Sequence, residues 1–275
     1  MRSRYVLLFL LVALVSIVTA GCGGSKSNSV TGSDSVDVSS NEAGVKVLVT
    51  VGGGSEFVLS GEVDSGLTAI QSVDVLAVIE TSYEGRFVSS IEGIASNPAE
   101  ESDWFFSVNG IEPDVGAAEV KLSDGDVVWW DYRNWYAVDV NPAIFVGAFP
   151  KPFHGGWKGV VRPIDVIAPE SLDDWAVELK NFLGKYQPDD PGAEPHLFEL
   201  KINPEIGFEG AKLSAQFRSG IEDSGSKNGA PVIFTLEGSE AVIQKVVTGL
   251  ISDPALIEHR YQVNFDKDGQ VVASS

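Results

Sequence analysis

The strongest alternation of apolar and polar positions lies in residues 103–135. Every second side chain of a strand points to the same face, so this alternation predicts two strands. Asn109-Gly110 ends the first strand, Asp124-Gly125 precedes the second, and both dipeptides form tight turns readily. The two strands are therefore expected to share one core. Its members are Trp104, Phe106, Val108, Val128, Trp130 and Tyr132.

The residues before these strands predict one helix and several further strands. Residues 45–51 are a β-branched run that favours a strand. Apolar positions in residues 64–73 have helical spacing, with Asp64 or Ser65 as the expected N-cap. Residues 78–91 are typical of a β-hairpin. The fold class expected here is α+β, with one helix against a mixed sheet.

The second half of the chain predicts a further α+β or α/β unit. Residues 170–183 have the apolar stripe of an amphipathic helix, and Ser239 is expected to cap another. Tyr261, Val263 and Phe265 alternate as a last strand. Further strands are expected at 160–167, 197–202 and 231–236.

A segment rich in Pro, Gly and aromatic residues, 148–159, connects the two halves. Its aromatic residues could form a binding lip or fill the joint between the halves, and we favour the second interpretation. His154 has no Ser or Asp partner at a recognisable spacing, which argues against a hydrolase triad. Asn264, Asp266, Asp268 and Gly269 resemble the start of a calcium loop, but Ser275 stands where that loop needs a Glu, so a hairpin with its turn at 267–269 is expected.

The N-terminus has the pattern of a secretory signal. Arg2 and Arg4 precede an apolar run that is shorter than a membrane-spanning helix, and small residues follow it. Cys22 comes directly after Ala20-Gly21, which resembles a bacterial lipobox, although Thr19 replaces the usual Leu. Residues 1–21 are thus predicted to be a signal peptide and Cys22 a lipidated, palmitate-bearing anchor. The alternatives are an ordinary signal that is cleaved without lipidation and an uncleaved anchor.

Composition narrows the classes of function. Residues 22–44 are rich in Ser and Gly and predict a flexible tether, followed by domains at 45–140 and 141–275. The net charge of −20 argues against nucleic-acid binding. Cys22 is the single cysteine and the three histidines are scattered, so no metal site is expected.

Four segments carry a resemblance to a known family, in the order GLTAIQSV, GRFVSSIEGI, WFFSVNG and DGDVVWWDY. The first domain resembles domain of unknown function 4430 (DUF4430), a β-grasp domain of bacterial lipoproteins. That domain is similar to the C-terminal domain of the cobalamin carriers transcobalamin and intrinsic factor. The resemblance implies a β-grasp fold and ligand binding, and it carries over no catalytic residue.

The face opposite the predicted core holds the candidate ligand-binding residues. Phe105, Trp129 and Asp131 point to that face, and Trp135 and Tyr136 follow the strand end. Grouped aromatic residues could bind a flat ligand or another protein, or pack against the second domain, and the spacing does not separate these alternatives. We predict that Trp129→Ala leaves the fold nearly intact while Trp130→Ala destabilises it strongly, and equal melting losses for the two would contradict the face assignment.

We therefore expect a non-enzymatic, extracytoplasmic lipoprotein held on the cell membrane by its lipid anchor. Its ligand would be a corrinoid or another flat organic molecule, delivered to a transporter partner for uptake; the corrinoid rests on the resemblance alone. No resident cofactor is expected. The alternative is a surface module that binds a protein or the cell wall without a small-molecule ligand.

Overall fold

A mixed sheet forms the scaffold of the first half. The structure, a computed structural model, describes residues 44–135, 144–157, 159–203, 210–218 and 230–272. Four strands pair in the order β2-β1-β7-β6, with β1 and β7 parallel and the other pairs antiparallel. Their bounds are Val45–Val51 (β1), Glu56–Val63 (β2), Ser102–Val108 (β6) and Val127–Asn134 (β7).

The predicted core face of β6 and β7 is confirmed. Strand pairing places Trp104 opposite Tyr132 and Phe106 opposite Trp130, and the two pairs of rings lie 5.4 and 5.1 Å apart. All six residues of the predicted face belong to one apolar cluster. Alternation in the sequence was sufficient here because each strand has one face against a helix and a hairpin.

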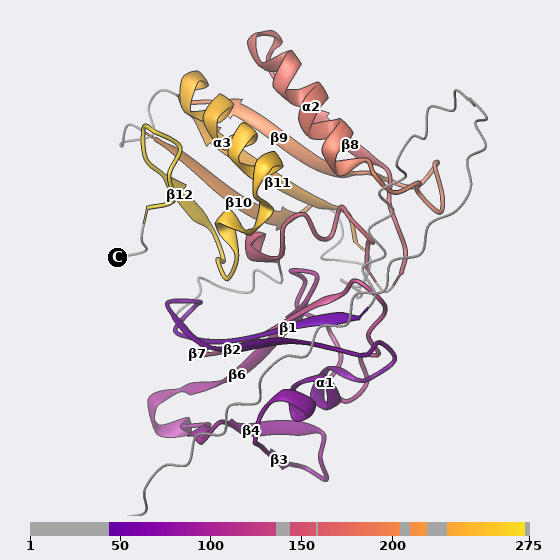
Figure 1. Cartoon of the computed structure of the whole chain (residues 1–275), viewed down its shortest axis with the longest axis vertical. Coiled ribbons are helices and arrows are strands. Elements are labelled where there is room, and N and C mark those ends of the chain that lie inside the picture. Colours follow the sequence, from indigo (N-terminus) through magenta and orange to yellow (C-terminus); the bar gives the residue numbers. More distant parts are fainter. Residues whose placement is uncertain (1–43, 136–143, 158, 204–209, 219–229, 273–275) are drawn as a thin grey trace, which may run out of the picture. The chain divides into compact units, whose positions relative to one another are not determined.

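Helix α1 (Ala69–Leu76) lies between this sheet and a small sheet of β3 (Ile79–Ser82), β4 (Phe87–Ile91) and β5 (Ile94–Ala95), as Figure 1 shows. The predicted hairpin is confirmed, but the predicted cap is wrong. Thr68 caps α1: its hydroxyl accepts a hydrogen bond from the backbone of Gln71, whose side chain accepts one from the backbone of Thr68. A Ser/Thr with Gln three residues later is a capping box, a stronger signal than a lone Asp or Ser.

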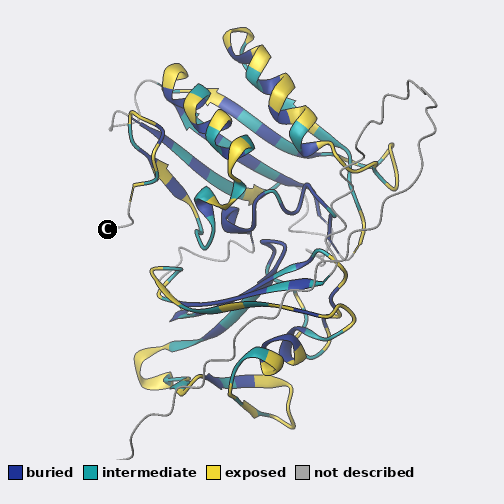
Figure 2. Ribbon diagram, viewed as in Figure 1, coloured by how far each residue is buried: buried dark blue, intermediate teal, exposed yellow. Residues whose placement is uncertain are grey.

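The second half is built on a five-stranded sheet with the order β12-β10-β11-β9-β8. Strands β8, β9 and β11 are parallel to one another, and β10 is antiparallel to both of its neighbours, β11 and β12. Helices α2 and α3 cover one face of it, and Figure 2 shows their buried sides turned toward the strands. The bounds are Ile164–Ile167 (β8), Asp173–Leu183 (α2), His196–Ile202 (β9), Ala211–Phe217 (β10), Val232–Gly238 (β11), Glu240–Ser252 (α3) and Val263–Phe265 (β12). Short 3₁₀ turns are Pro98–Glu100 (η1), Val146–Ala148 (η2), Glu170–Leu172 (η3) and Pro254–Ile257 (η5). The α+β class predicted from the sequence is confirmed.

Three local predictions in this half need correction. Strand β8 begins at Ile164 rather than residue 160, after Pro163, which has no N–H to give to a ladder. Strand β10 was not predicted at all. Tyr261 lies before β12 rather than in it, because its ring packs on Trp129 of the first sheet instead.

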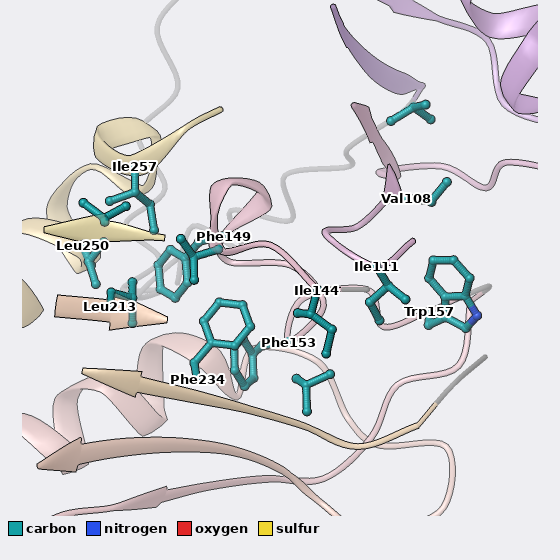
Figure 3. Close-up of a cluster of buried hydrophobic side chains, with 14 of the residues drawn as sticks. Val108, Ile111, Ile144, Phe149, Phe153, Trp157, Leu213, Phe234, Leu250 and Ile257 are labelled. Carbon is teal, nitrogen blue, oxygen red and sulfur yellow. The ribbon is translucent and has the colours of Figure 1, made fainter. Parts of the chain in front are cut away.

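The aromatic connecting segment fills the joint, as the favoured interpretation predicted. Phe149, Phe153, His154 and Trp157 are all buried. Figure 3 shows Phe153 beside Phe234, and the rings are 5.0 Å apart; Ile111 of the first half pairs with Ile144 nearby. One apolar cluster therefore runs through both sheets. The described residues fall within one compact unit, Asn41–Ser275. The predicted border near residue 140 lies outside the described residues and stays a prediction.

Candidate functional site

A cavity of about 620 Å³ opens where the connecting segment meets the start of β1 and the ends of α2 and α3. Its wall combines apolar and ionisable side chains in comparable proportion. The apolar members are Val45, Val127, Phe149, Pro150, Phe182 and Pro254. The ionisable members are Lys46, Glu62, Asp126, Lys151, His154, Lys185, Asp253 and Glu258.

Asp126 is the most firmly held acid of the cavity. Its carboxylate accepts hydrogen bonds from the Asn109 side-chain amide at 2.7 Å and from the Ser123 backbone N–H at 2.7 Å. Asn109 is itself fixed at a positive φ of 53° in the Asn-Gly turn, and it accepts a hydrogen bond from the Val127 backbone. Burial raises the pKa of Asp126, although these hydrogen bonds and the charge of Lys151 oppose the shift. The two turns recognised in the sequence thus meet at one carboxylate.

Phe149 and Phe182 give the cavity a flat apolar wall. Their rings stack with centroids 6.0 Å apart and an interplanar angle of 25°. His154 supports this wall from behind, since its Nε2 atom lies 2.8 Å from the Phe182 carbonyl oxygen near the end of α2. The peptide bonds Phe149-Pro150 and Lys151-Pro152 are both cis. The wall is accordingly assembled from the connecting segment and one helix end.

Charged side chains form the rim. Lys46 of β1 makes an ion pair with Glu258, which follows η5. The Glu258 carboxylate also lies 3.3 Å from the His259 ring. Burial lowers the pKa of His259, while the Glu258 charge acts in the opposite direction. Both halves of the chain therefore contribute to the rim.

The predicted ligand-binding residues lie elsewhere, around Trp129. Trp129 packs with Leu48 and Phe145, and its ring is 4.8 Å from Tyr261. Its indole N–H donates to the Thr50 hydroxyl, and Thr50 donates to Asp131 at 2.6 Å. Only 3% of Trp129 and 2% of Asp131 is exposed. The second half of the chain occupies this part of the face, which is one of the alternatives left open by the sequence.

Asp131 is fully supplied with donors from the protein. Besides Thr50, the backbone N–H groups of Gly53 and Gly54 donate to its carboxylate, and the Tyr261 hydroxyl donates at 2.6 Å. The glycine run at 52–54 is thus a small anion-binding nest filled by an internal carboxylate. Burial first, and then the Asp131 charge, raise the pKa of the Tyr261 phenol. The phenol accordingly stays protonated and keeps its donor at neutral pH.

The remaining candidates are only partly brought together. Phe105 lies under the Arg133 guanidinium, 4.1 Å from ring centroid to carbon, and Arg133 donates to the Tyr261 hydroxyl. Trp135 is 45% exposed and outside this group, and Tyr136 lies outside the described residues. None of the four described candidates lines the cavity. Ligand contact by any of them stays a prediction.

The burial of Trp129 changes one expected outcome. The sequence interpretation expected Trp129→Ala to leave the fold nearly intact. Trp129 and Trp130 are both buried, so truncation of either should now remove a similar apolar area and lower the stability by about 3–5 kcal/mol. Alternation told the two faces apart, but it did not show that both are covered.

Sequence reasoning missed the cavity residues Asp126, Lys151 and Phe182. Asp126 had a recognisable signal, because Asn-Gly and Gly-Asp turns beside paired strands bring an amide and an acid to one sheet edge. Lys151 and Phe182 had none, because they reach the site through contacts with residues distant in the chain.

A comparison with protein families supports the resemblance seen in the sequence. Residues 65–134 match the family model DUF4430, a domain of unknown function. This confirms the predicted DUF4430 relationship for that part of the chain. The DUF4430 region contributes Gly125, Asp126 and Val127 to the cavity, and residues beyond it contribute much of the rest. No curated protein matches the chain.

Two solved structures are similar to about a third of the chain. One is a proposed metal-binding protein from Ruminococcus gnavus ATCC 29149, with 18% identity and a TM-score of 0.29 over 34% of this chain and 99% of that one. The other is haptocorrin in complex with Cbi, with 13% identity and a TM-score of 0.27 over 34% of this chain and 25% of haptocorrin. These similarities are too low to carry an argument about function.

Two features are absent from the described residues. In that part of the chain, no cluster of three or more His, Cys, Asp and Glu side chains is placed to hold a metal ion. Nor does any helix there have the length and apolar character that crossing a bilayer requires.

Proposed function

We propose that this protein is an extracytoplasmic, membrane-anchored lipoprotein that binds a small organic molecule in the cavity without converting it chemically. The observation that carries the proposal is the cavity itself, about 620 Å³ and lined by both apolar and ionisable side chains. Small-molecule sites are usually concave, mostly apolar and roughly 300–1,000 Å³ in volume. The stacked rings of Phe149 and Phe182 favour a ligand with a flat face, and a corrinoid is one such ligand.

A bulky substitution in the cavity wall tests the binding site. Ala255 lies in η5 on the wall and is exposed, so Ala255→Trp should fill part of the cavity without disturbing the core. Ala99 is a matched control. It is also exposed in a 3₁₀ turn that starts with Pro, and an Asn caps it where Asp253 caps Ala255.

The binding measurement uses the soluble chain from residue 42 onward, with thermal shift and calorimetry against cobalamin, cobinamide and haem. We expect at least one of these to bind the unsubstituted chain and Ala99→Trp equally, and to bind Ala255→Trp at least tenfold more weakly. Absence of binding by the whole panel, or equal binding to both variants, would contradict the proposal.

The anchor is tested in cells. Cys22→Ala should abolish labelling by palmitate and release the protein from the membrane fraction, because a stable anchor needs the acyl chains attached at that thiol. Membrane retention of Cys22→Ala without a lipid label would instead indicate that an uncleaved signal holds the chain.

An exposed apolar group supports a second candidate function. Val75, Val78 and Tyr83 are 63%, 74% and 80% exposed at the end of α1 and in the β3–β4 hairpin. Phe87 stands edge-on to Tyr83, 6.3 Å between centroids. Exposed apolar side chains, and the Tyr83–Phe87 pair in particular, favour a protein contact surface. A transporter or another surface protein would be the partner, and replacing Tyr83 and Phe87 with Ser should then abolish its copurification.

A further inference from the structure

Two buried side chains of opposite charge, Asp126 and Lys151, mark the polar end of the cavity. Asp126 is 4% exposed and Lys151 is 5% exposed, yet both contribute to the lining. The Lys151 charge acts on the Asp126 carboxylate. Lys151 belongs to the connecting segment, and its Nζ atom lies beside Gly155. A Cβ added at Gly155 would be 2.9 Å from that nitrogen.

Asn109 ties this pair to the connecting segment. Its amide donates to Asp126 at 2.7 Å and to the Gly156 carbonyl oxygen at 2.9 Å. Asn109 is fully buried, so these hydrogen bonds are protected from water. Asn109 therefore fixes the Asp126 carboxylate against the connecting segment, which also carries Lys151.

The acceptor capacity of Asp126 is only partly used. A carboxylate offers about four lone-pair positions, and those of Asp126 accept two hydrogen bonds from the described residues. A donor on a molecule in the cavity can therefore still bind to Asp126.

The charges of the pair decide what kind of donor fits. A charged ligand group would be attracted by one of these side chains and repelled by the other, so its net electrostatic gain there is small. It would also lose its hydration on entering a partly apolar site. An uncharged group that offers both an N–H donor and a carbonyl acceptor complements both partners without that loss.

We infer that the cavity selects a ligand with a flat apolar body and an uncharged carboxamide, whose N–H binds to Asp126 beside Lys151. This inference rests on the proposed function, because it assigns a ligand class to the same cavity. Phe149 and Phe182 hold the flat body, and Asp126 is the residue that sets specificity.

Three probes of equal shape and different charge test the inference: 2-naphthamide, 2-naphthoate and 2-naphthylmethylamine. Their affinities are measured by calorimetry and by ligand-observed NMR on the soluble chain from residue 42. We expect 2-naphthamide to bind at least tenfold more tightly than either charged probe. Ala255→Trp should weaken its binding by a similar factor, which locates the probe in the cavity.

Charge-neutralising variants should change which of the three probes binds most tightly. A purely structural role of Asp126 or Lys151 would leave that preference unchanged. Asp126→Asn leaves the Lys151 charge unbalanced, so the preference should shift toward 2-naphthoate. Lys151→Gln leaves the Asp126 charge unbalanced and should shift it toward the amine. Asp74→Asn, the same change at an exposed position of α1, should leave the order of the three probes unchanged.

The outcomes separate this inference from the proposed function. Tighter binding of a charged probe than of 2-naphthamide, or the same order of probes in Asp126→Asn and Lys151→Gln, would overturn the carboxamide assignment. If the three probes fail while cobalamin, cobinamide or haem binds, the assignment is wrong and the binding function stands. If nothing binds, both are wrong. Should Asp126→Asn fail to fold, Lys151→Gln decides.

Discussion

His196 shows how one buried side chain ties stability to pH. It is 1% exposed in β9, its Nδ1 atom accepts the Val232 backbone N–H at 3.1 Å, and its Nε2 atom has no partner among the described residues. Burial, and to a smaller extent the charge of Arg162, lowers the pKa of His196 to about 3. The folded protein therefore keeps this ring neutral at mildly acidic pH, where the unfolded chain binds a proton.

The sign of the pH effect follows from this difference. Between an unfolded pKa of about 6.5 and the folded value, only the unfolded chain carries the extra proton, so stability falls as the pH is lowered. The contribution of His196 is at most about 1.4 kcal/mol for each pH unit in that window. His196→Asn keeps an acceptor for Val232 and removes the titration. Urea unfolding from pH 7 to pH 4 should show a shallower loss of stability in this variant than in the unsubstituted protein. Parallel curves would contradict the assignment, whatever the absolute stability of the variant.

The start of α1 illustrates what a helix cap contributes. The Thr68 side chain and the Gln71 side chain each satisfy a backbone N–H that the first turn leaves without a partner. Ser239 holds the same position before α3 but makes no capping hydrogen bond through its side chain. Residue type alone therefore did not identify the bonded cap: the sequence analysis named Asp64 or Ser65 instead of Thr68, and Ser239 makes no side-chain bond.

This difference predicts unequal effects of the same kind of substitution. Thr68→Ala should lower the free energy of unfolding by about 1 kcal/mol, within a usual range of about 0.5–2. Ser239→Ala should have a clearly smaller effect, because no side-chain bond is lost. The two losses of stability are measured as shifts in the denaturant midpoint, provided that the slope of free energy against denaturant stays constant. Equal losses in Thr68→Ala and Ser239→Ala would show that the capping box adds no stability.

The strands of the first half could be predicted well from the sequence, and those of the second half less well. Trp104 and Trp130 were assigned to the correct face because β6 and β7 each alternate over a full strand. Strand β10 was overlooked, and Tyr261 was assigned to a strand although it packs on Trp129. The local pattern shows which residues alternate along the chain. Packing between distant segments decides which residues a side chain such as Tyr261 contacts.

The backbone at Gly147 approaches the backbone at Arg260 closely where the two halves of the chain meet. Gly147 of η2 donates its N–H to the Arg260 carbonyl oxygen at 2.8 Å. A Cβ at Gly147 would lie 2.4 Å from the Arg260 backbone nitrogen and 2.7 Å from that oxygen, so the two segments would have to move apart. The same segments carry Phe145 and Tyr261, which cover Trp129.

Gly147→Ala should consequently lower the free energy of unfolding by about 1–3 kcal/mol, the usual effect of overpacking. Gly116→Ala is the matched control, since the nearest atom to its added Cβ, the Glu119 carboxylate oxygen, is 3.9 Å away. Chemical denaturation followed by Trp fluorescence would report both. A loss in Gly147→Ala no larger than in Gly116→Ala would show that the joint tolerates expansion.

The sequence by itself determined the α+β class, the core face of β6 and β7, and the DUF4430 relationship, because strand alternation and turn-forming dipeptides act over a few residues. Only the tertiary structure decided that the opposite face is covered and that the cavity lies at Asp126, Lys151 and Phe149. These features depend on contacts between residues far apart in the chain, whose burial and electrostatics no local pattern encodes.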